Sequence, residues 1–206
     1  MRLAFLVSDR GRLMQAVIRA CQEGLPCTPV VCITDRACEA VAHAPLWHVL
    51  DRKSYATTAA FSDDVLTVLQ ENQIDLALLT FNSLLEGQVL EAYRHRLLNY
   101  HPSLLPAFTG FKARYRALAS GSTIGGGTLH FVDDGVDTGP VVAQWAVPLL
   151  PDDTPSSYGD RQFALGVQAT LQALRWIVAG RVIVENGRVR IEGADYDTLP
   201  INPSEP

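Results

Sequence analysis

The sequence has no closely spaced pair of cysteines. Its four cysteines, Cys21, Cys27, Cys32 and Cys38, follow one another at intervals of six, five and six positions. Structural zinc sites usually need closer pairing than this. We therefore expect no metal site, and we expect the four thiols to be reduced and to pack as small hydrophobic side chains.

A long hydrophobic run is also missing. Hydrophobic residues make up 48% of the 206 residues, but no stretch approaches the roughly 18 apolar residues of a membrane helix. The apolar start, Met1–Val7, is too short for the apolar region of a signal peptide and leads directly into polar Ser8 and Asp9. These absences predict a cytoplasmic protein with no membrane partner.

Positive charge is not in excess. The chain has 17 Lys and Arg residues against 22 Asp and Glu residues, which gives a net charge of −5. Domains that bind nucleic acid usually carry a basic face or stripe, and none stands out here. We expect no nucleic-acid partner.

The length and the apolar content suit one domain with a sizeable core. Three prolines fall within residues 198–206. The sequence therefore predicts a single domain over residues 1–197 and a flexible tail over residues 198–206.

Short apolar runs alternate with amphipathic segments along the chain. Strands are expected at residues 3–7, 29–34, 46–50, 74–80, 97–100, 128–132 and 140–147, and helices at residues 13–21, 59–70, 87–93, 113–120 and 155–180, before a hairpin over residues 181–191. This alternation is typical of βαβ units. It predicts an α/β fold, Rossmann-like, with a mostly parallel sheet and helices on both faces.

Two polar residues end the strand expected at residues 97–100. Asn99 and His101 are two positions apart, so an extended backbone points both side chains to one face. Pro102 favours an extended geometry for the residue before it. Ligands of open α/β sheets bind where strands end, so this amide and imidazole are candidate site residues.

A carboxylate in a glycine-rich loop is the third candidate. Asp137 lies in the segment Asp133–Pro140, whose two glycines permit backbone geometries that other residues resist. A calcium-binding loop is the competing interpretation, but the spacing and the closing glutamate of an EF-hand are missing. Taken alone, the segment is best explained as a simple turn.

Together these motifs resemble those of the folate-dependent formyltransferases. The resemblance rests on Asn99–Pro106, Gly110, Thr128–Val132 and Val136–Pro140, and more loosely on Gln144–Pro148. Their order and spacing agree with the family, as do the flanking strands. The resemblance implies the formyltransferase fold and transfer of a formyl group from 10-formyltetrahydrofolate to the amine of a small molecule.

The expected chemistry suits these residues. Formyl transfer passes through a tetrahedral carbon that carries an oxyanion, and the Asn99 amide can donate to that oxygen. The His101 imidazole can move the proton, and Asp137 can orient it. The resemblance further implies a donor-binding region made of Phe81, Asn82, Ser83, Leu84, Leu85, Asp133, Asp134, Gly135 and Val136. His130 is either a supporting residue of the site or a core histidine.

Departures from the family pattern bear on the acceptor. The glycinamide ribonucleotide enzymes carry a Gly-x-Gly-Ser-Asn loop that holds a phosphate, whereas this chain has Asp9–Leu13. A family glutamate and a family basic residue correspond to Gly166 and Ser83. An amino sugar nucleotide or a secondary-metabolite amine is therefore the preferred acceptor. The alternative is phosphoribosylglycinamide, with Arg10, Gly11 and Arg12 forming an altered phosphate loop.

Other functional classes remain open. A hydrolase that releases formate would use the same donor, and a catalytically silent folate-binding module would keep the fold alone. A nicotinamide-binding enzyme is disfavoured because the Gly-x-Gly-x-x-Gly pattern is missing. The sequence leaves open whether the chain acts as a monomer or a homodimer.

Overall fold

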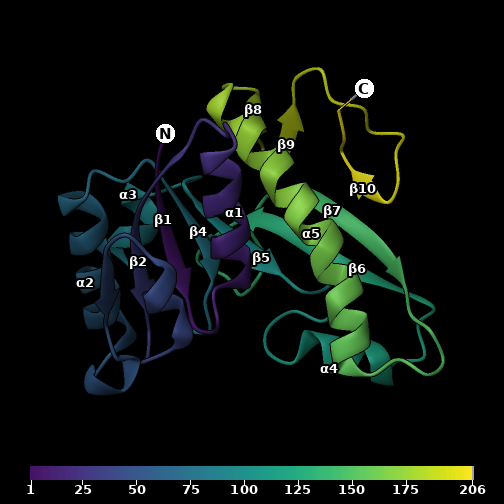
Figure 1. The fold of residues 1–206 in the computed structure, drawn as a ribbon, viewed down its shortest axis with the longest axis horizontal. Coiled ribbons are helices and arrows are strands. Elements are labelled where there is room, and N and C mark those ends of the chain that lie inside the picture. The colour runs from purple at the N-terminus through teal and green to yellow at the C-terminus, as the bar shows by residue number, and fades with distance from the viewer. Residues whose placement is uncertain (206) are drawn as a thin grey trace. The chain divides into compact units, whose positions relative to one another are not determined.

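A computed structural model describes residues 1–205 (Figure 1). Its contacts divide the chain into two compact units. The first unit contains Met1–Asn99 and Phe131–Asp134, and the second contains Tyr100–His130 and the chain from Gly135 onward.

Parallel strands form the first unit. Their order is β3 (Trp47–Val49), β2 (Thr28–Thr34), β1 (Arg2–Val7), β4 (Leu76–Thr80) and then the start of β5 (Leu97–His101). The helices of this unit are α1 (Arg12–Gln22), η1 (Glu39–His43), η2 (Arg52–Ser54), α2 (Thr58–Glu71) and α3 (Gln88–Ala92).

Burial on both faces explains the apolar runs of these strands. Residues of α2 and α3 pack against one face of the strands, where Ala4 and Leu6 of β1 are buried. The alternate residues Leu3, Phe5 and Val7 are buried as well. A strand covered on both sides reads as a continuous apolar run, as β1 does.

Antiparallel strands form much of the second unit. Strand β7 (Val141–Pro148) pairs with β6 (Ile124–Phe131) on one side and with β10 (Ile201–Asn202) on the other. Helix α5 (Pro155–Val178) packs against β7, and α4 (Ala113–Ala119) packs against α5. Strands β8 (Val182–Glu185) and β9 (Arg188–Ile191) form the expected hairpin, which turns at Asn186 and Gly187.

Strand β6 begins four residues earlier than predicted, at Ile124 instead of Thr128. The added residues include Gly125, Gly126 and Gly127, and glycine normally weakens a strand. Here each glycine is required by a close neighbour. A Cβ atom on Gly126 would lie 1.9 Å from the backbone oxygen of Trp145, and one on Gly127 would lie 2.0 Å from the Trp145 ring.

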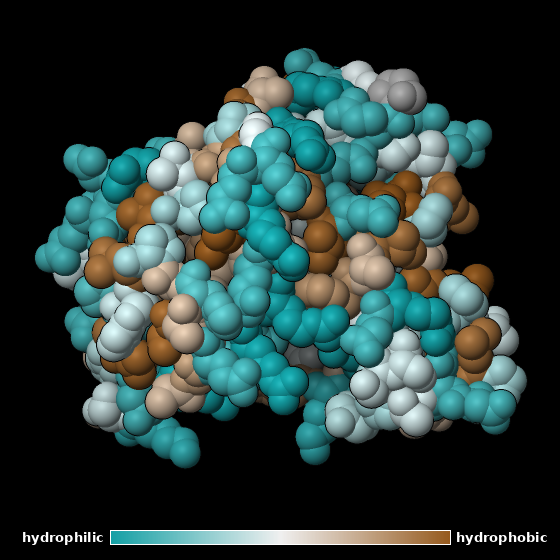
Figure 2. Space-filling model, in the orientation of Figure 1, coloured by the Kyte–Doolittle hydropathy of each residue, from teal (hydrophilic) through white to brown (hydrophobic). Residues whose placement is uncertain are grey.

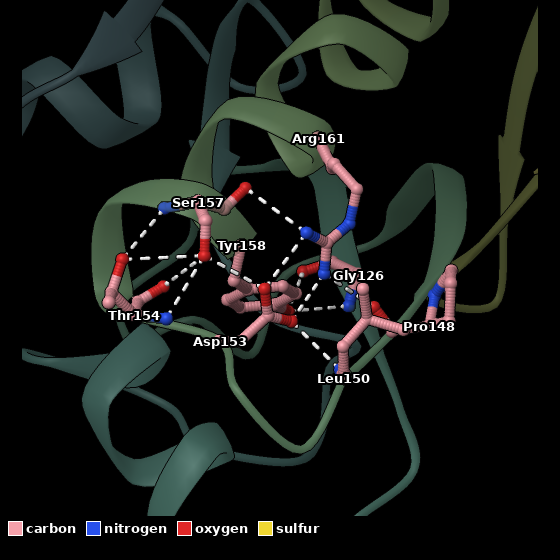
Figure 3. Close-up of polar contacts among 8 residues, drawn as sticks. All are labelled: Gly126, Pro148, Leu150, Asp153, Thr154, Ser157, Tyr158 and Arg161. Carbon is pink, nitrogen blue, oxygen red and sulfur yellow. Dashed lines mark hydrogen bonds and ion pairs between the residues drawn. The ribbon is translucent and has the colours of Figure 1, made fainter.

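A hydrogen-bonded cap starts α5 (Figure 3). Thr154 and Ser157 each accept from the other's backbone N–H, which forms a capping box, and Pro155 occupies the first turn. Arg161, two turns into the helix, pairs with Asp153 and donates to the carbonyl of Pro148 at 3.1 Å. This arrangement ties the end of β7 to the start of α5.

The α/β fold with mostly parallel strands is confirmed, and the predicted elements are present with shifts of a few residues at their ends. Within the segment predicted as a flexible tail, Ile201–Asn202 pair with β7, and Ser204 bridges to Asp195. Pro206, the last residue of that predicted tail, lies outside the described residues.

Apolar and polar residues are mixed on the surface of the molecule. On the face drawn in Figure 2, apolar residues are scattered among hydrophilic ones and no single apolar area dominates. Within residues 1–205, no helix is long and apolar enough to cross a membrane.

Candidate active site

Strand β5 positions Asn99 and His101. Leu97 and Leu98 are fully buried and anchor the strand, which pairs with β4 from Leu97 to Asn99. Because residues alternate along a strand, Asn99 and His101 leave the same face of β5. His101 is 5% exposed, so its imidazole is largely removed from water.

Asp137 lies against the His101 ring. Its Oδ2 atom is 3.2 Å from His101 Nδ1 and accepts a 2.7 Å hydrogen bond from the backbone N–H of Gly110. Its Oδ1 atom is 3.4 Å from Nε2 of His130, which is also buried. The structure therefore brings together two of the three predicted catalytic residues, and it places His130 on the same carboxylate.

Both nitrogens of the His101 ring face acceptors. Nδ1 faces the Asp137 carboxylate, and Nε2 lies 3.1 Å from the carbonyl oxygen of Phe108. Burial nevertheless lowers the pKa of His101 below 6.5, although Asp137 and the Phe108 carbonyl favour the charged ring. The imidazole is therefore neutral near pH 7 and can accept a proton.

The charge of Asp137 is held by its neighbours. Burial by itself would raise the pKa of the carboxyl group. Hydrogen bonds from His130 and from the Gly110 N–H outweigh burial and keep the pKa of Asp137 below its usual value of 3.8. Asp137 also adopts a positive φ of 55°, an uncommon backbone conformation for a residue other than glycine. Such conformations often occur at functional sites.

The loop after His101 is fixed by side chains of β6 and β7. The Thr128 hydroxyl donates to the carbonyl of Ser103 at 2.7 Å and accepts from the N–H of Leu105 at 3.0 Å. Gln144 donates from Nε2 to Leu105 O and to Thr128 Oγ1, both at 3.0 Å. These contacts hold the chain that leaves His101.

The predicted donor-binding residues fall in both units. Phe81, Asn82, Ser83, Leu84, Leu85, Asp133 and Asp134 belong to the first unit, and Gly135 and Val136 belong to the second. Residues 81–85 follow directly after β4. The Ser83 hydroxyl donates to Oδ2 of Asp35 at 2.7 Å, and the Asn82 N–H donates to the Ser8 hydroxyl at 2.7 Å.

Asp35 is a buried neighbour of the predicted donor-binding residues that the sequence did not reveal. It directly follows β2 and is 1% exposed, which is unusual for a carboxylate. An acidic residue at the end of an apolar strand was the available signal, but its partner Ser83 is 48 positions away in the sequence.

The predicted acceptor loop precedes α1. Gly11 adopts a left-handed conformation with a φ of 68° and caps the helix, and its N–H donates to Asp9 Oδ1 at 2.9 Å. Arg10 lies 3.8 Å from Glu39, and both side chains are mostly exposed. Arg12 is the first residue of α1 and is exposed.

The four cysteines are buried or half-buried. All four are free, and burial raises the pKa of Cys27 to about 11 and that of Cys32 to about 12. These two thiols therefore stay protonated at neutral pH. Across residues 1–205, no group of three His, Cys, Asp or Glu side chains is placed to hold a metal ion.

Several known proteins resemble most of the chain. Glycinamide ribonucleotide transformylase 1 from Symbiobacterium toebii is 36% identical, with a TM-score of 0.89 over 93% of this chain and 93% of that chain. The phosphoribosylglycinamide formyltransferase of Bacillus subtilis is 32% identical over 160 residues, which are 74% of this chain and 82% of that protein.

Larger proteins contain a related segment. The trifunctional purine biosynthetic protein adenosine-3 of Bos taurus is 34% identical over 197 residues, or 91% of this chain, but the chain spans only 19% of that protein's length. The Formyl transferase family model matches residues 1–174. The chain therefore belongs to the formyl transferase family.

Proposed function

We propose that the protein transfers the formyl group of 10-formyltetrahydrofolate to the amine of phosphoribosylglycinamide. The observation that carries the proposal is the near-complete match to a glycinamide ribonucleotide transformylase, which covers 93% of both chains. The preference for an amino sugar nucleotide or a secondary-metabolite amine gains no support from the relatives. Their names favour the phosphoribosylglycinamide alternative.

The dyad of His101 and Asp137 fits the reaction. The acceptor amine attacks the formyl carbon, a carbon–nitrogen bond forms, and the carbonyl electrons move to oxygen. When the tetrahedral carbon collapses, its bond to the folate nitrogen breaks. The amine has then lost one proton and the folate nitrogen has gained one.

Each proposed catalytic residue has one task in this sequence. The Asn99 amide donates a hydrogen bond to the oxyanion, which is the position where negative charge develops. Neutral His101 takes the proton from the amine and returns a proton to the folate nitrogen. Asp137 orients the ring through the 3.2 Å contact to Nδ1 and stabilises the imidazolium while it exists.

The contact between the Phe108 carbonyl and the His101 ring must break for this chemistry to occur. The carbonyl oxygen lies 3.1 Å from Nε2 of His101, the ring nitrogen that does not face Asp137. Nε2 is therefore the nitrogen that exchanges protons with the substrates, and the contact with Phe108 is replaced when they bind. Because the Phe108 carbonyl favours the charged ring, its departure lowers the pKa of His101 further, and Nε2 of the neutral imidazole is open to the proton of the acceptor amine.

The phosphate of the acceptor needs a positive partner. We place Arg12 in this role, because a guanidinium can grip a phosphate bidentately and Arg12 starts α1 at the carboxyl end of β1. Gly11 keeps the backbone close to that end of the strand.

Steady-state kinetics with several acceptors test the proposal. Purified protein with 10-formyltetrahydrofolate should formylate phosphoribosylglycinamide with a higher kcat/KM than any amino sugar nucleotide in the same assay. Higher efficiency with an amino sugar nucleotide would overturn the choice of acceptor.

Arg12→Ala tests the phosphate contact. The substitution should raise the KM for phosphoribosylglycinamide about tenfold or more and leave the KM for the folate unchanged, because a charge-assisted hydrogen bond to the acceptor is lost. Arg19→Ala removes another exposed arginine from the same helix and serves as the control. Equal KM values in both variants would remove Arg12 from the site.

A further inference from the structure

We infer that Asp35 is a positioning residue for the donor: it fixes the segment Phe81–Leu85, defined here as the donor loop, in the conformation that binds the folate. The inference rests on the proposed function, which assigns folate binding to this loop. It adds a buried residue that lies outside the loop and touches neither substrate.

The donor loop has no helix or strand of its own, so other contacts must hold it. Its ends are fixed by packing. Phe81 stacks on Phe61 with a centroid distance of 5.9 Å, and Leu85 is buried in the core of the first unit. The N–H of Glu86 donates to the buried Ser62 hydroxyl at 3.0 Å.

The middle of the loop is fixed by polar contacts to the ends of two strands. Ser83 donates to Asp35, which follows β2, and Asn82 donates its N–H to Ser8, which follows β1. Ser8 in turn hydrogen-bonds Asp35. Strand β1 lies between β2 and β4, so one buried carboxylate connects three strand ends.

Asp35 is well suited to act as a rigid anchor. Its two oxygens accept from Nε and Nη2 of Arg36 at 2.9 and 3.0 Å, a bidentate geometry. Its own carbonyl accepts from the N–H of Arg52 at 2.9 Å, which fixes the backbone as well. Burial would by itself raise the pKa of Asp35, but bonds from Arg36, Ser83 and Ser8 keep it below 3.8, and the anchor is charged at neutral pH.

The anchoring leaves one apolar side chain in the open. Leu84 is 56% exposed, while the residues on both sides of it, Ser83 and Leu85, are held by Asp35 and by the core. An apolar side chain presented from a pinned loop offers a surface for a flat heterocycle such as a pterin. If the Asp35–Ser83 contact is lost, Leu84 is free to move and the folate must order the loop when it binds.

Binding of tetrahydrofolate, measured by calorimetry, tests the inference without turnover. Ser83→Ala should raise the Kd about tenfold, because it removes one hydrogen bond to a charged group. Asp35→Asn should raise the Kd at least as much. Adding Ser83→Ala to Asp35→Asn should have little further effect, since both substitutions break the same contact.

Two further variants separate positioning from general stability. Ser83→Thr keeps the hydroxyl and should bring the Kd back to within about threefold of wild type. Ser54→Ala removes a serine hydrogen bond of 2.7 Å elsewhere in the same unit and should leave the Kd unchanged.

The binding measurements distinguish failure of this inference from failure of the proposed function. A Kd for Ser83→Ala within twofold of wild type, with wild-type protein that binds tetrahydrofolate, would overturn the inference and leave the proposed function standing. Wild-type protein that binds no tetrahydrofolate would overturn the proposed function, and this inference with it. If Asp35→Asn does not fold, the comparison of Ser83→Ala with Ser83→Thr decides the matter.

Discussion

A single carboxylate organises the residues expected to perform the chemistry. Asp137 contacts His101 and His130 through different oxygens and also accepts from the Gly110 N–H. A carboxylate that is held on three sides cannot turn away from the His101 ring. The orientation of the imidazole is therefore set before any substrate arrives, which is how preorganised sites lower a barrier.

Removing either partner of this dyad should slow turnover strongly. His101→Ala and Asp137→Asn should each lower kcat about a hundredfold or more, because a positioned proton-transfer group or its orienting partner is lost. Initial rates of tetrahydrofolate formation at saturating substrates measure this effect. Asp63→Asn changes an exposed carboxylate on α2 and is the control. Near-wild-type rates in both dyad variants would remove His101 and Asp137 from catalysis.

The protonation of His101 gives a test that needs no turnover. Burial lowers its pKa below 6.5, and the Asp137 carboxylate opposes that shift by favouring the charged ring. Asp137→Asn removes the opposing charge, so the pKa should fall further. The NMR titration of the His101 ring, assigned with His101→Gln, should show a midpoint below pH 6.5 that moves to lower pH in Asp137→Asn. A midpoint above 6.5, or an upward shift in the variant, would contradict this electrostatic account.

The lowered pKa of His101 also predicts how the rate depends on pH. The neutral ring is the reactive form, so kcat/KM should decrease as the pH falls through the pKa of His101 in the free enzyme.

Individual site residues differed in how far the sequence could reveal them. The period of two in a strand predicted that Asn99 and His101 share a face, and the family pattern pointed to Asp137. His130 stayed ambiguous because spacing alone could not show that its ring reaches Asp137. Asp35 escaped notice because its contacts with Ser8 and Ser83 depend on which strands are neighbours.

Glycines shape the elements of the second unit through close packing. Within α5, Gly166 faces the buried rings of Tyr100 and Trp145, where a Cβ atom would lie 2.3 Å from the Tyr100 hydroxyl and 2.7 Å from Trp145 Cζ2. Gly159, in the same helix, has only the flexible end of Arg114 nearby, at 3.3 Å. Close packing therefore requires glycine at position 166 but not at position 159.

Alanine at these two positions should have opposite effects. Gly166→Ala should lower the free energy of unfolding by about 1–3 kcal/mol, because the added methyl group overpacks a rigid contact. Gly159→Ala should be neutral or should raise it by up to about 1 kcal/mol, because alanine is the better helix former. Urea unfolding of both variants makes the comparison. Equal effects would show that the packing around Gly166 is looser than described.

Helix and strand boundaries could be predicted from the sequence where neighbouring residues in the chain determine them. The helix start at Thr154 and the hairpin turn at Asn186 and Gly187 both carry strong local signals, and both are present. The early start of β6 and the pairing of β10 were not predictable. Both depend on tertiary neighbours, namely Trp145 and the edge of β7, which no local pattern specifies.

At the scale of the whole chain, the acceptor was the weakest expectation. The altered loop at Asp9–Leu13, together with Gly166 and Ser83, argued against phosphoribosylglycinamide. Similarity over 93% of this chain to a glycinamide ribonucleotide transformylase, and over 74% of it to a phosphoribosylglycinamide formyltransferase, points the other way. A guanidinium can bind a phosphate in place of backbone amides and a serine.

Transfer of an isotopically labelled formyl group tests the account most directly. Wild-type protein is incubated with 10-formyltetrahydrofolate labelled in the formyl carbon, together with phosphoribosylglycinamide, and the acceptor, the folate and free formate are followed by mass spectrometry. We expect the label to appear in phosphoribosylglycinamide in equal amount to the tetrahydrofolate formed, and we expect the rate to fall about a hundredfold or more in His101→Ala. Label released as formate while phosphoribosylglycinamide stays unmodified would contradict the account.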